Sequence, residues 1–107
     1  MKHTILALAI LCGNAHAEFY TGNDLLQKFD SESHGERMLA IGYVMGVFDV
    51  GQSVLHCSPA TVTSGQVRDM AAAYIRGTPA KRHKSAESLI NEVLAAAWPC
   101  PKRGVTL

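Results

Sequence analysis

The sequence predicts an all-α domain built from four short helices and held by one disulfide bond. Apolar residues recur at three- and four-residue spacing in four separate segments, whereas the two-residue alternation of strands is nowhere sustained. Short breaks rich in serine, glycine and proline separate these segments, and hydroxyl residues that can cap a helix precede three of them. A pair of cysteines lies near the end of the second segment and after the fourth.

The first helix is expected to begin at Thr21, whose hydroxyl can accept a hydrogen bond from the first turn. Asp24, three residues later, can return a bond to the backbone of Thr21, which is the pattern of a capping box. The polar run 30–33 is expected to end this helix. The apolar residues between these points share one face: Leu25, Leu26 and Phe29.

The second helix is expected over residues 36–56 and is apolar on nearly every face. Such a helix is typical of the centre of a bundle or of a contact with a partner. A membrane span is rejected because Asp49 and Gln52 interrupt the run, which is then shorter than the roughly 20 residues a span needs. Gly42 and Gly46 share a face and give a weak indication of dimerisation. Asp49 is expected to accept hydrogen bonds from a neighbouring helix start, with a binding role as the alternative.

The run 57–59 is expected to end the second helix, because its proline disfavours helical backbone before it. A second capping box, residues 63–66, predicts the start of the third helix, which residues 77–79 end. Ser85 can cap the fourth helix, and Pro99 ends it. The inner faces of these two helices are Val67, Met70, Ala71, Tyr74 and Ile75, and Ala86, Leu89, Ile90, Val93, Leu94 and Ala97.

Residues 1–17 are interpreted as a secretory signal peptide. A basic start precedes a brief apolar run, and Ala15-His16-Ala17 offers the small residues that a signal peptidase requires. Cleavage after Ala17 leaves about 90 residues, 18–107, which we expect to form a single helical domain. No membrane insertion is expected once the signal is removed.

The mature chain keeps two cysteines, Cys57 and Cys100. An even number of cysteines in an exported chain favours a disulfide over two free thiols. The bond would close a loop of about 43 residues. It would tie the end of the second helix to the end of the fourth.

No motif in the sequence indicates catalysis, a cofactor or a metal site. The histidines His34, His56 and His83 show no pair at metal-ligand spacing and are expected to be solvated surface residues. The sequence has no glycine-flanked nucleophilic serine and no phosphate-binding glycine loop. Acidic residues dominate 18–57 and basic residues 58–107, a charge too dilute for nucleic-acid binding. The protein is therefore not expected to be an enzyme.

The basic link between the third and fourth helices is the best candidate for a partner-binding surface. It is expected to be exposed, and loops placed by a rigid scaffold often carry function. A solvated loop without a binding role is the alternative. The candidate contact residues are Pro79, Lys81, Arg82, His83 and Lys84.

Several short motifs follow one another in an order that resembles a known family. They are Thr21-Gly22-Asn23-Asp24-Leu25-Leu26, Gly42-Tyr43-Val44-x-Gly46-Val47-x-Asp49, Cys57-x-Pro59, Val62-Thr63-x-Gly65-Gln66, Tyr74-Ile75-x-x-x-Pro79, Arg82-His83-x-x-Ala86 and Ala95-Ala96-Ala97-Trp98-Pro99-Cys100-Pro101. Each motif is weak alone. The ordered set covers nearly all of the mature chain and resembles the Rap/Tai-type immunity proteins.

This resemblance implies a small periplasmic helical protein, often a homodimer, that binds a peptidoglycan amidase effector of type VI secretion and occludes its cleft. The closing cysteine pair of the family corresponds to Cys57 and Cys100. Many members carry a second cysteine pair, at places where this chain has Phe29 and Ala40, a large and a small apolar residue that can fill the same space. The alternative function is a periplasmic acid-stress chaperone of the HdeA-like type, since such chaperones are also small, helical, exported and disulfide-bonded.

Overall fold

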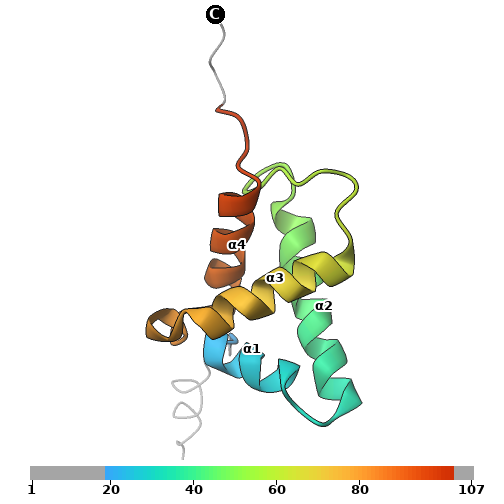
Figure 1. Cartoon of the computed structure of the whole chain (residues 1–107), viewed down its shortest axis with the longest axis vertical. Helices are drawn as coiled ribbons and strands as arrows, with labels where there is room; N and C mark the ends of the chain where they lie inside the picture. The colour runs from blue at the N-terminus through green and yellow to red at the C-terminus, as the bar shows by residue number, and fades with distance from the viewer. Residues whose placement is uncertain (1–18, 103–107) are drawn as a thin grey trace, which may run out of the picture.

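The computed structural model describes residues 19–102 and shows four α-helices and one short 3-10 helix, with no strand in that range. The elements are α1 (Gly22–Phe29), α2 (His34–Gly51), α3 (Ser64–Gly77), η2 (Pro79–Lys81) and α4 (Ala86–Ala97). In Figure 1, α3 runs across α2 and α4, and α1 closes the lower end of the bundle. The all-α, four-helix prediction is confirmed. The predicted signal peptide lies outside the described residues.

Side-chain caps fix the starts of the helices. At α1 both halves of the predicted capping box are present, because Thr21 Oγ1 accepts from the Asp24 N–H at 3.1 Å and Asp24 Oδ2 accepts from the Thr21 N–H at 3.0 Å. Thr63 caps α3 by accepting from the Gln66 N–H at 3.1 Å, without the reciprocal bond that a full box needs. A cap that was not predicted, Ser33, starts α2 two residues earlier than expected.

The hydrophobic core lies between the four helices. Ala40 is fully buried in it, and Phe29 packs against it, so both residues contribute to the core. The aromatic side chains Tyr43, Phe48 and Trp98 are partly buried around it. The buried members are Leu25, Leu26, Ala40, Val44, Val67, Ala71, Ile75, Ala86, Leu89, Ile90 and Leu94.

The second helix ends at Gly51, so the prediction of a helix to residue 56 was wrong. The Gly51 carbonyl accepts hydrogen bonds from the N–H groups of Val54, Leu55 and His56, at 3.0, 2.7 and 3.3 Å, which closes a turn where the helix would have continued. Ser53 takes a left-handed backbone conformation, with φ of 69°, and this reverses the chain.

One face of α2 is exposed although it is apolar. Met38, Leu39 and Val50 keep 45%, 47% and 81% of their surface open, and Val54 and Leu55 in the following turn are also exposed. The helix is therefore not enclosed at the centre of the bundle, and a contact of this face with a partner stays a prediction. None of the described helices is both long enough and apolar enough to cross a membrane.

Asp49 also lies on the exposed side of α2. Its carboxylate accepts no hydrogen bond from residues 19–102, although a bond to a neighbouring helix start was expected. A structural role for this carboxylate is therefore not observed, and the alternative of a binding role stays a prediction.

The predicted disulfide is present between Cys57 and Cys100, whose Cα atoms are 4.8 Å apart. It joins the segment that follows α2 to the segment that follows α4. The Cys57 N–H donates to the Trp98 carbonyl at 2.8 Å, so a backbone hydrogen bond supports the same connection. The chain ends of two helices are thus held together on the side away from α1 (Figure 1).

His56 is fully buried, so its assignment as a solvated surface histidine was wrong. Its Nε2 lies 3.1 Å from the Phe48 carbonyl and its Nδ1 lies 2.8 Å from Ser58 Oγ. Because a carbonyl can only accept, Nε2–H is the donor, and in the neutral ring Nδ1 accepts from the Ser58 hydroxyl. The imidazole therefore connects the turn after α2 to the last turn of α2 through hydrogen bonds. His34 and His83 are exposed as expected.

Candidate functional site

The predicted binding loop forms a compact, hydrogen-bonded turn rather than an extended link. Pro79–Lys81 is a 3-10 helix, and the N–H groups of Lys81, Arg82 and Lys84 donate to carbonyls three residues earlier. The loop projects from the end of α3 (orange in Figure 1) and returns directly into α4. Its backbone is therefore ordered before any partner binds.

The start of α1 anchors this loop. The first N–H groups of a helix have no partner within the helix, and two of them here donate to loop carbonyls. The Gly22 N–H donates to the Lys84 carbonyl and the Asn23 N–H donates to the Arg82 carbonyl, both at 2.9 Å. The conformation of the loop thus depends on an element more than fifty residues away in the sequence.

Gly22 is needed for this approach of two backbones. A Cβ atom at this position would lie 2.7 Å from Leu89 Cδ1 and 3.0 Å from the Arg82 carbonyl oxygen. Backbone atoms cannot move away as a flexible side chain can. The glycine in the first predicted capping motif therefore determines how closely Arg82 is held against α1.

Lys81 is held by α4 and is less available to a partner than the sequence suggested. Its Nζ lies 3.2 Å from Glu92 Oε1, and the Tyr74 hydroxyl donates to the same oxygen at 2.6 Å. The hydrogen bond from Tyr74, followed by the one from Lys81, lowers the pKa of Glu92. The same carboxylate raises the pKa of both partners, chiefly through these hydrogen bonds. Lys81 is thus a residue that positions the loop.

We expect acid to loosen this attachment of the loop. The pKa of Glu92 is lowered in the folded chain, so its stabilising effect is complete above the ordinary glutamate value of about 4.3 and is lost as the pH falls through the lowered value. Substitution Glu92→Gln should therefore reduce the melting temperature modestly at pH 7 and by less at pH 3, relative to the unchanged chain. Circular dichroism melts at both pH values measure this difference, with the exposed Glu32→Gln as the control. An equal effect of Glu92→Gln at both pH values would contradict the assignment.

The side chains that remain available to a partner are those of Pro79, His83 and Lys84, which are exposed, and of Arg82, which is partly exposed. They project from a backbone that is fixed at both ends. Four of the five predicted contact residues therefore lie on one accessible turn, and the fifth supports it.

A concave feature of the surface was not predicted from the sequence. It is a groove between α2 and α4, with a volume of about 420 Å³. The signal that could have found it is the pair Gly42 and Gly46, which was interpreted only as an indication of dimerisation. In the structure neither glycine has a neighbouring atom within 4 Å of the place where a Cβ would lie, so the pair opens a groove.

The described residues contain no cluster of three or more histidine, cysteine, aspartate or glutamate side chains that could hold a metal ion. The cysteines, which would be the strongest ligands, are joined to each other. The candidate surfaces of the described residues are therefore an ordered basic loop and an apolar groove.

A comparison with known protein families matches residues 21–100 to the family described as Rap1a immunity proteins. The match extends from the cap of α1 to the second cysteine of the disulfide, and it includes the whole loop. The chain belongs to the Rap1a immunity proteins. The resemblance found in the order of its motifs is thereby confirmed. A comparison with individually curated proteins gives no match.

A Rap1a immunity protein is expected to bind a cognate effector, because neutralising a toxin is what defines an immunity protein. Immunity protein families are generally not enzymes. The geometry of this Rap1a immunity protein fits that role, because the fold already orders its accessible loop.

Proposed function

We propose that this protein is a periplasmic immunity protein that binds a peptidoglycan amidase effector of type VI secretion and occludes its catalytic cleft. The family match carries the proposal, because it covers both the fold and the loop. Occlusion would protect the cell from its own toxin or from that of a sibling cell.

The loop of residues 79–84 is the proposed occluding element. A contact segment that is already ordered loses little conformational entropy when it binds, and this favours high affinity. Here α1 holds the loop backbone through two hydrogen bonds, and Glu92 holds Lys81 from the other side. Arg82 and His83 then present a guanidinium and an imidazole that can donate hydrogen bonds to acceptors inside a cleft.

The proposed location is the periplasm, reached by cleavage of residues 1–17, with residues 18–107 forming one helical domain. The disulfide supports this proposal, because such bonds persist in oxidising compartments. A homodimer is part of the proposal as well. The exposed apolar side chains of α2 are compatible with self-association, and sedimentation equilibrium of the mature chain would measure it.

Substitution of Arg82 and His83 by alanine should weaken inhibition of the amidase by about 100-fold, the loss expected when two central contact residues are truncated. The loop backbone should be unchanged, because the carbonyls that accept from α1 remain. Purified type VI amidases, isolated peptidoglycan and the mature chain suffice to measure inhibition constants.

The matched control is the double variant Arg68→Ala and His34→Ala, which removes the same two residue types from exposed or partly exposed positions outside the loop. It should inhibit as the unchanged chain does. Equal inhibition by the loop variant and the control would place the occluding surface elsewhere on the molecule.

A further inference from the structure

The first residues of the described chain run antiparallel to the segment that joins the loop to α4. Thr21 and Ser85 form an antiparallel bridge, and the Tyr20 carbonyl accepts a hydrogen bond from the Ala86 N–H at 2.8 Å. The two hydrogen bonds from the start of α1 to the loop continue this pairing. The end of a chain is usually loose unless contacts of this kind hold it. The position of residues 20–23 is therefore fixed relative to the loop of residues 79–84.

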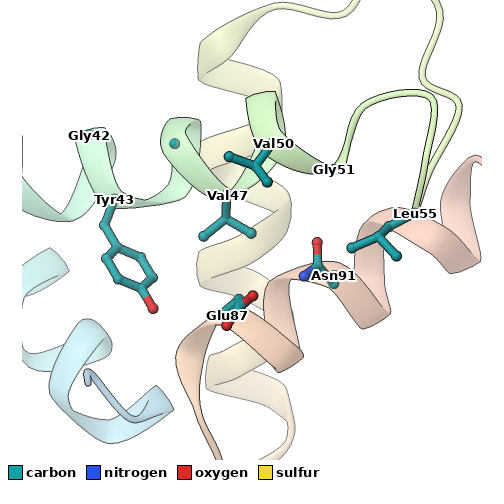
Figure 2. A pocket seen from close by; sticks show the side chains of 9 residues that line it. Gly42, Tyr43, Val47, Val50, Gly51, Leu55, Glu87 and Asn91 are labelled. Atoms are coloured by element: carbon teal, nitrogen blue, oxygen red, sulfur yellow. The ribbon is translucent and has the colours of Figure 1, made fainter. Parts of the chain in front are cut away.

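The packing of Tyr20 determines the direction of the side chain that precedes it. The ring centroids of Tyr20 and Tyr43 are 5.2 Å apart, and Lys28 Nζ lies 5.1 Å from the centroid of the Tyr20 ring. Tyr43 projects from α2 toward α1 and α4 (Figure 2). Successive side chains of a paired, extended segment point to opposite sides, so an inward Tyr20 directs Phe19 outward. Phe19 accordingly keeps 75% of its surface exposed.

The location of Phe19 distinguishes it from the other large apolar side chains that are exposed. Single exposed apolar residues are common and need no explanation by themselves. Within residues 19–102, however, the other five belong to α2 or to the turn that follows it: Met38, Leu39, Val50, Val54 and Leu55. Phe19 is the one aromatic among the six, and its backbone neighbours are paired with the loop and its junction with α4. It therefore adds an apolar contact beside a surface whose other exposed groups are polar.

Phe19 and the loop are close enough for a single partner to cover both. Phe19 is three residues from Gly22, so the Cα atoms of these two residues are at most about 11 Å apart. Gly22 is hydrogen-bonded to Lys84, and residues paired in this way have Cα atoms about 5.5 Å apart. Phe19 thus lies within roughly 17 Å of Lys84. A standard interface covers about 800 Å² on each partner, which is roughly 30 Å across.

We propose that Phe19 is a second anchor for the effector and inserts into an apolar recess at the rim of the cleft that the loop occludes. This inference rests on the proposed function, because its partner is the effector that the loop binds. Aromatic residues are enriched in the apolar centres of interfaces, whereas polar groups surround them. The matching effector surface offers an apolar recess for Phe19, with hydrogen-bond acceptors beside it for Arg82 and His83. Both contact segments are ordered before binding, so little conformational entropy is lost.

Substitution Phe19→Ser in the mature chain should weaken inhibition of the amidase that the unchanged chain inhibits by at least about tenfold. A loss of this size is expected when a large apolar side chain is removed from the centre of an interface. Val54→Ser is the matched control, because Val54 is 73% exposed and lies in the turn after α2. It should leave inhibition unchanged. Phe19→Leu keeps an apolar side chain and should retain most of the affinity, and all three variants should melt close to the unchanged chain.

A direct contact is distinguished from support of the loop by adding Phe19→Ser to the Arg82→Ala and His83→Ala variant. The losses of independent contacts add as free energies, so the fold changes multiply. Phe19→Ser should therefore weaken inhibition by at least about a further tenfold in the loop variant. If Phe19 acted only by supporting the loop, the loop variant would already contain its effect. An added substitution without any effect would overturn the inference.

The inference and the proposed function can fail separately in these measurements. Equal inhibition by Phe19→Ser and Val54→Ser, with a weakened loop variant, would overturn the second anchor and leave the proposed function intact. If the unchanged chain inhibits no amidase, the proposed function fails first and the inference fails with it. Altered sedimentation of Phe19→Ser with unchanged inhibition would assign Phe19 to a contact between two copies of this chain, which also overturns the inference.

Discussion

Removal of the Cys57–Cys100 disulfide should lower the free energy of unfolding by about 4 kcal/mol. The bond joins residues 43 apart, and a closed loop of that length removes this much chain entropy from the unfolded state. The effect is large for a domain of this size, because small domains bury a limited apolar core and have a total stability of about 5 to 15 kcal/mol. Urea unfolding of the mature chain with and without dithiothreitol measures it.

The control for this experiment is the double variant Cys57→Ala and Cys100→Ala, whose unfolding should not respond to the reductant. Both cysteines are only partly buried, so the alanines remove the cross-link without opening a large cavity. A loss of less than about 1 kcal/mol on reduction would show that the backbone bond between Cys57 and Trp98, together with the packed helices, already holds the two chain ends together.

Substitution of His56 by alanine should lower the free energy of unfolding by about 3 kcal/mol. The change leaves a cavity where the ring was and removes the partners of the Ser58 hydroxyl and the Phe48 carbonyl. The ring also packs on the Phe48 side chain, with centroids 4.8 Å apart. Chemical unfolding curves give the value directly.

The other two histidines of the described chain are natural controls. His34→Ala and His83→Ala alter exposed side chains and should change the stability by less than about 0.5 kcal/mol. If His56→Ala were as mild as these two, the turn after α2 would not depend on the imidazole, and its burial would be incidental.

The helices and the disulfide were predictable because their signals are local. Thr21, Thr63 and Ser85 stand directly before apolar periodicity, and each caps the helix that it was expected to start. The disulfide followed from a count of the cysteines together with the expectation that the chain is exported. The helix caps depend on residues within one turn of each other, and two cysteines allow only one pairing.

The end of α2 and the burial of His56 could not be predicted, because both depend on a tertiary arrangement. The apolar run continues past Gly51, and only the bonds to the Gly51 carbonyl and the reversed backbone at Ser53 show that the helix has stopped. His56 then turns back into the fold. In the sequence it is one histidine among apolar and small residues, with no pattern that distinguishes it from an exposed one.

The position of the loop between α3 and α4 was predictable, whereas the contacts that hold it were not. Pro79 and the basic run 81–84 identified the loop. No pattern in the sequence indicated that α1 donates hydrogen bonds to its carbonyls or that Lys81 pairs with Glu92. The groove has the same character, because Glu87 and Asn91 meet α2 only in the folded chain. Contacts between distant segments determine which charged side chains remain available to a partner.

Protection of living cells is the most direct test of the proposed immunity function. Bacterial cells that export a type VI amidase to their periplasm are expected to lyse. Their growth is measured without a co-exported protein and with the unchanged chain. It is also measured with the Arg82→Ala and His83→Ala variant and with the Arg68→Ala and His34→Ala control. We expect full growth with the unchanged chain and the control, and lysis with the loop variant. Lysis in every case despite folded, exported protein, together with capture of denatured proteins near pH 2 to 3, would contradict it and favour an acid-stress chaperone.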